Sequence, residues 1–135
     1  MRTCNMKKIT YLLYLVGAIQ IVLGLFHLFA PEFFLKNTGH SIPEADIYYP
    51  IAMLASRFIA YGIALIYIAK NAQAHTLWIW FMVLIQAIDL GAGIFYTATG
   101  VVSLADSAFP MFNATWIMLL LFLWMPKTNN NVSHV

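Results

Sequence analysis

Four long apolar runs, separated by short polar connections, constrain the fold of this 135-residue chain more than any other feature. Each is close to the ~20 apolar residues that a helix needs to cross a lipid bilayer. The chain is 62% hydrophobic and only 9% charged, whereas soluble domains carry about 25% charged residues. A chain this short cannot bury so much apolar surface in one globular core, so lipid must cover it. The expected fold is all-α, as a single integral membrane domain over residues 1–135.

The boundaries of the helices follow from the runs and from the residues that interrupt them. We expect Pro31 to end the first helix, because a proline lacks the N–H that a continuing helix needs. A tight polar turn at Lys70 should make the second and third helices antiparallel neighbours, and Asp106 and Ser107 are candidate N-caps of the fourth. The prediction is an up-down-up-down transmembrane bundle of four helices, at residues 9–30, 50–69, 77–98 and 109–125.

Lysine and arginine predict the orientation of this bundle, because cytoplasmic loops carry an excess of them. The N-terminal flank, the turn at Lys70 and the tail from Lys127 carry five together, while the opposite side has Lys36 alone. Both termini should therefore be cytoplasmic.

Several function classes are disfavoured by what the sequence lacks. A formal net charge of +2 is too small to indicate nucleic-acid binding. Cys4 is the only cysteine, so an intramolecular disulfide or a Cys-x-x-Cys redox site cannot form. The four histidines are too scattered to predict a metal site. No catalytic motif is present, so we name no catalytic residue and lean against an enzyme.

Only two strongly ionised side chains lie within the apolar runs, Arg57 in the second and Asp89 in the third. Counted from the outer ends of their helices at about 1.5 Å per residue, both lie ~10–13 Å deep. Such a charge costs about 2.5–3.5 kcal/mol at mid-membrane, so it usually faces inward and finds a partner. We therefore expect a salt bridge between Arg57 and Asp89.

Other small and polar residues share the faces of these two charges, at the three- and four-residue steps of one helix stripe. The stripes are Gly17, Gln20, Gly24 and His27; Arg57, Ala60, Ala64 and Tyr67; and Gln86, Asp89, Gly93 and Tyr96. Asn113, near the outer start of the fourth helix, can join them at the same level.

Two interpretations of these stripes are open. In the first, the polar side chains bond to one another and only hold the helices together. In the second, they line an outward-facing pocket for an amphipathic molecule such as a lipid, whose anionic or carbonyl end would lie near Arg57. The candidate ligand-binding residues are Gln20, His27, Arg57, Gln86, Asp89, Tyr96 and Asn113.

The chain also resembles small four-helix bacterial membrane proteins of the BphX-like and DoxX-like type. The likeness lies in FHLFAPEFF at the end of the first helix, ASRFIAYGIAL in the second and QAIDLGAG in the third. The resemblance implies a multi-pass protein of the bacterial inner membrane, without a transferable active site. It also makes a quinone ligand or a partner membrane subunit conceivable, although the residues themselves identify no cofactor.

Two further functions are alternatives to a binding or accessory protein. One is a proton-coupled transporter that uses Asp89, and the other is a membrane enzyme acting on a lipid-soluble substrate. The small multidrug-exporter type is disfavoured, because it uses a carboxylate in its first helix and this chain has none there. The bilayer is the expected environment, and a homo-oligomer is compatible with the sequence.

Overall fold

The computed structural model describes residues 2–126, with side-chain surroundings from residue 6 onward. Over this range the chain is all-helical. The long helices are α1 (Arg2–Phe29), α3 (Tyr48–Ile68), α4 (Thr76–Ala98) and α5 (Leu104–Leu123). The short ones are α2 (Pro31–Asn37) and the 3-10 helices η1 (Ala45–Ile47) and η2 (Ala69–His75). The tail from Lys127, which contributes to the predicted orientation, lies outside the described residues.

Proline and serine mark two of the helix boundaries. As predicted, α1 stops just before Pro31, which opens α2. The predicted start of the fourth helix near Phe109 was wrong, because α5 begins at Leu104 and holds Pro110 in its interior. Asp106 and Ser107 are not its N-caps. Ser103 is the cap, and its Oγ accepts the backbone N–H of Asp106 at 3.2 Å.

Three helical segments are long and apolar enough to cross a membrane: Met6–Phe29, Ala45–Ala98 and Leu104–Leu123. The second, of 54 residues, contains both α3 and α4. Large apolar side chains are exposed on every long helix, among them Leu15, Ile63, Leu84 and Leu119. Soluble monomers rarely expose so much contiguous apolar surface, so this is a membrane protein with transmembrane helices.

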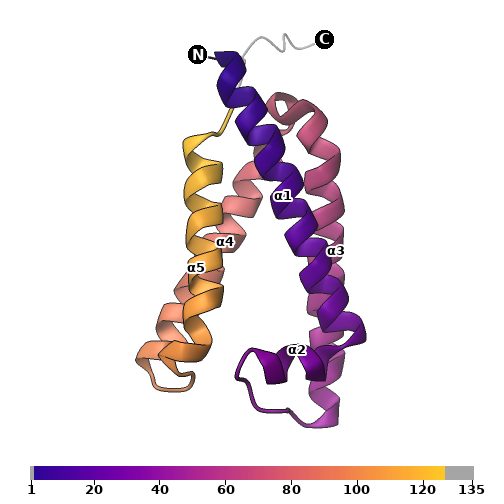
Figure 1. Ribbon diagram of the computed structural model, residues 1–135, viewed down its shortest axis with the longest axis vertical. Helices are drawn as coiled ribbons and strands as arrows, with labels where there is room; N and C mark the ends of the chain where they lie inside the picture. The colour runs from indigo at the N-terminus through magenta and orange to yellow at the C-terminus, as the bar shows by residue number, and fades with distance from the viewer. Residues whose placement is uncertain (1, 127–135) are drawn as a thin grey trace.

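The long helices form two pairs, α1 with α3 and α4 with α5. Figure 1 shows the pairs converging at one end of the molecule and diverging at the other, where α2 lies. The prediction that α3 and α4 are packed neighbours was wrong. They meet near their connection, where the ring centroids of Tyr61 and Trp78 are 6.3 Å apart, but they do not pack along their length. Between them Asn71 has a non-helical backbone (φ −146°, ψ 63°).

Glycines explain why α1 pairs with α3. A Cβ on Gly17 would lie 2.8 Å from the carbonyl oxygen of Gly62, and a Cβ on Gly62 would lie 2.7 Å from that of Gly17. Further along α1, a Cβ on Gly24 would lie 2.9 Å from the carbonyl oxygen of Ala55. In lipid, such small residues allow two backbones to approach and gain van der Waals contact. The α1–α3 interface is therefore built on backbone contact.

A dry core fills the end where the two pairs converge. Its members are completely or almost completely buried and all apolar: Ile9, Leu12, Leu13, Val16, Leu65, Ile68, Ala69, Ala72, Ile79, Met82, Val83, Ile117 and Leu121. This core joins the two pairs at one end only, so the space between them opens toward the other end.

Candidate functional site

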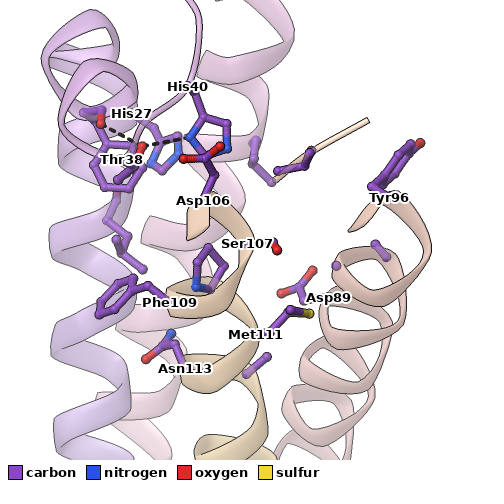
Figure 2. A pocket seen from close by; sticks show the side chains of 18 of the residues that line it. His27, Thr38, His40, Asp89, Tyr96, Asp106, Ser107, Phe109, Met111 and Asn113 are labelled. Atoms are coloured by element: carbon purple, nitrogen blue, oxygen red, sulfur yellow. Dashed lines mark hydrogen bonds between the residues drawn. The ribbon is translucent and has the colours of Figure 1, made fainter. Parts of the chain in front are cut away.

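A cavity of about 410 Å³ lies between the two helix pairs at their diverging end. Its walls come from α1, α2, α3, α4 and α5, and its lining is mainly apolar. Figure 2 shows polar side chains from several of these elements converging on it. This volume and this lining are typical of sites for small molecules, which combine apolar walls with a few placed polar groups (roughly 300–1,000 Å³).

The two glutamines lie where the cavity meets the dry core. Gln20 of α1 and Gln86 of α4 are each 3% exposed. Both direct their Nε2 toward the thioether sulfur of Met82, at 4.0 Å from Gln20 and 3.4 Å from Gln86. The Oε1 atom of Gln20 is buried and has no hydrogen-bond partner. Rotating the amide by 180° would place its nitrogen, instead of its oxygen, at this position without a partner. One polar end of Gln20 is therefore unpaired in either orientation.

Asp89 of α4 and Asn113 of α5 both line the cavity. Asp89 lies three residues after Gln86, which places the two side chains as neighbours on one face of α4. Its carboxylate makes no hydrogen bond or ion pair with the residues that the structure describes. Asn113 Oδ1 accepts the indole N–H of Trp116 at 3.2 Å. This leaves its Nδ2 to face the cavity.

His27 forms part of the α1 wall and has a defined tautomer. Its Nδ1 lies 2.7 Å from the carbonyl oxygen of Leu23. Since a carbonyl only accepts, Nδ1 carries the proton and the neutral ring presents Nε2 as an acceptor. The ring packs 4.4 Å from that of Phe34 on α2 and 5.6 Å from that of Phe58 on α3, between ring centroids.

The mouth of the cavity is formed by residues that the sequence analysis did not place there, namely Thr38, His40 and Asp106. The chain turns at Gly39 after α2 with a positive φ of 82°, which glycine adopts most easily. This turn brings Gly39 against the Asp106 carboxylate, which a Cβ at that position would strike. Thr38 Oγ1 lies 3.0 Å from His40 Nδ1. The sequence did contain one signal for this turn, since a glycine just after a helix commonly adopts the left-handed conformation that ends the helix.

Arg57 is the predicted site residue that the structure places elsewhere. It is exposed on α3 and does not line the cavity. The expected salt bridge with Asp89 is not formed, since within residues 6–126 no two oppositely charged side chains have a nitrogen and an oxygen within 4.0 Å of one another. The reason is helix pairing: α3 packs on α1 with Ala55, Ile59 and Gly62. The predicted stripe through Arg57 is therefore not its packing face.

The remaining six predicted residues all line the same cavity: Gln20, His27, Gln86, Asp89, Tyr96 and Asn113. In the described part of the chain, no three histidine, cysteine, aspartate or glutamate side chains gather where a metal ion could be held. The arrangement provides an apolar chamber with several unpaired hydrogen-bond acceptors.

Comparison of the chain with models of protein families, with curated proteins and with solved structures finds no match. The resemblance to BphX-like and DoxX-like proteins stays a prediction.

Proposed function

We propose that this chain is a small multi-pass membrane protein that binds an amphipathic small molecule in the cavity between its two helix pairs. In this proposal the four long helices cross the membrane up-down-up-down. Lys7, Lys8 and Lys70 belong to the converging end and Lys36 to the diverging end. The positive-inside rule then favours a converging end, and with it both termini, on the cytoplasmic side of a bacterial plasma membrane.

The unpaired Oε1 of Gln20 carries the proposal. A buried polar atom without a partner costs about 1–3 kcal/mol, and nearly all such atoms in folded proteins are satisfied. Gln20 lines a cavity large enough for a small molecule, while its Oε1 is covered by neighbouring atoms that a ligand would have to displace. A ligand that reaches the floor would supply the missing partner, and its apolar part would contact Leu23, Leu54 and Phe58.

A cavity-filling variant tests this proposal. Ala92 lines the cavity from α4 and is exposed there, so Ala92→Trp should fill the space without disturbing the core. We expect native mass spectrometry of the full chain, purified in mild detergent, to show a bound small molecule that Ala92→Trp lacks. Trp78, exposed on the same helix but outside the cavity, provides the control Trp78→Phe, which should keep the ligand. Equal occupancy of the wild type and Ala92→Trp would refute binding in this cavity.

A further inference from the structure

The charges that line the cavity define what kind of molecule it can hold. Two carboxylates, those of Asp89 and Asp106, line it, and no lysine or arginine does. The sequence suggested an anionic or carbonyl group near Arg57, but Arg57 lies outside the lining. An anion would therefore meet negative charge in a low-dielectric surrounding, where like charges repel strongly.

Several hydrogen-bonding groups in the lining are acceptors, which attract a positively charged donor as the two carboxylates do. His27 uses its Nδ1–H on the Leu23 carbonyl and presents Nε2 as an acceptor. The hydroxyl of Thr38 donates to the carbonyl of Phe34 at 2.9 Å, so its oxygen accepts Nδ1–H of His40 and leaves that ring with an acceptor as well. Gln20 Oε1 and the Asp89 carboxylate are further acceptors without a partner, whereas the amide donors of the lining, those of Gln20, Gln86 and Asn113, are neutral.

Asp89 has a second polar side chain beside it at the floor of the cavity. Gln20 and Gln86 approach the same sulfur atom of Met82. Asp89 follows Gln86 by three residues, a spacing at which helical side chains are neighbours at about 5–6 Å between Cβ atoms. A group with several N–H donors that binds the Asp89 carboxylate therefore has the Gln86 amide beside it.

We propose that the ligand is a lipophilic amine, bound as its ammonium cation with the N–H groups directed to Asp89. The inference rests on the proposed function, because it names the chemical class of molecule that the same cavity takes. The ammonium neutralises Asp89, in place of the ion pair that Arg57 does not make. Phe34, Phe58 and Phe109 line the walls, and aromatic faces attract cations that are partly removed from water.

The test uses three probes with the same twelve-carbon chain: dodecylamine, dodecanoate and dodecanol. Saturable binding to the full chain in phosphatidylcholine nanodiscs is measured, with empty nanodiscs subtracted. We expect dodecylamine to bind about tenfold more tightly than the other two, as charge-assisted hydrogen bonds are the stronger kind. Dodecanoate or dodecanol binding as tightly as dodecylamine would overturn the cation assignment.

Variants separate the charge from the cavity. Asp89→Asn should weaken dodecylamine about tenfold, and Arg57→Gln, a charge change in α3 outside the cavity, should not weaken it. The comparison of the three probes on the unchanged chain provides a second test, which does not depend on the folding of Asp89→Asn. If Asp89→Asn folds and leaves dodecylamine binding unchanged, the inference is wrong.

Ala92→Trp distinguishes failure of this inference from failure of the proposed function. Loss of dodecanoate binding in Ala92→Trp, with no preference for the amine, would leave the cavity as the site and reject only the cation. If Ala92→Trp alters the binding of none of the probes, the cavity is not a binding site and both proposals fail.

Discussion

At the end where the helix pairs converge, Leu13, Val16, Ile79 and Ile117 are completely buried within an apolar core. At the diverging end the same two pairs enclose a cavity lined by carboxylates, imidazoles and amides. The core and the cavity meet at Met82, which belongs to the core while its sulfur contacts the two glutamines of the cavity floor. The contrast teaches that close packing and open space are divided along the length of this molecule.

The division has a physical basis in how helices associate in lipid. Without a strong hydrophobic force between helices, close packing and hydrogen bonds provide the attraction. The converging end supplies packing, and within each pair the backbones also approach closely. The diverging end can therefore leave polar groups unpaired, since its geometry is held by contacts elsewhere.

The largest expected effect is at the glycine contact that holds α1 to α3. Gly62→Val should lower the free energy of unfolding by about 3 kcal/mol, because its Cβ would lie 2.7 Å from the Gly17 carbonyl and the backbones would have to separate. Thermal unfolding in detergent micelles measures this loss. Gly91→Val is the matched control, since no atom lies within 4 Å of a Cβ there. A similar loss in both variants would show that α1 and α3 are not in close contact.

The next effect compares the two ends directly. Ile117→Ala should cost about 2 kcal/mol, because Ile117 is completely buried in the core and its removal leaves a void. Leu54→Ala in the cavity wall should cost much less, because Leu54 is 41% exposed before the change. Unfolding by denaturant in the same micelles gives both values. Equal costs would contradict the distinction between a packed and an open end.

The smallest effect has the opposite sign. Gln20→Met should raise the unfolding free energy of the ligand-free protein by about 1 kcal/mol, because it removes an unpaired buried oxygen, keeps the side-chain volume and gives up only the longer, 4.0 Å contact with Met82. Gln86→Met is the control; it should not stabilise, because it gives up the 3.4 Å contact of Nε2 with Met82. Thermal unfolding of delipidated samples measures both. Destabilisation by Gln20→Met would mean that its oxygen is already satisfied, against the structure.

Much of the cavity could be predicted from helix periodicity. Gln86, Asp89, Gly93 and Tyr96 form one stripe in the sequence and line one wall in the structure. In α1 the predicted stripe is divided between two neighbours: Gln20 and His27 face the cavity, whereas Gly17 and Gly24 face α3. Periodicity identifies which residues share a face, but it does not identify the helix that the face will meet.

The Arg57 prediction failed for that reason. It assumed that helices joined by a short turn must pack together. The similar depths of Arg57 and Asp89 in the membrane therefore predicted a contact between them. The glycines of α1 and α3 offered a closer approach than any residues shared by α3 and α4. The positions of His40 and Asp106 also depend on tertiary structure, because the turn at Gly39 has a signal in the sequence but its approach to α5 does not.

The sequence by itself determined that this chain is helical and belongs in a membrane, because run length and hydrophobicity are local properties that the bilayer constrains directly. It also determined which polar residues lie on common faces. Only the tertiary structure decided the pairing of the helices, and with it the absence of the Arg57–Asp89 ion pair and of any lysine or arginine from the cavity lining. Pairing depends on how closely two backbones can approach, which is a property of two surfaces together.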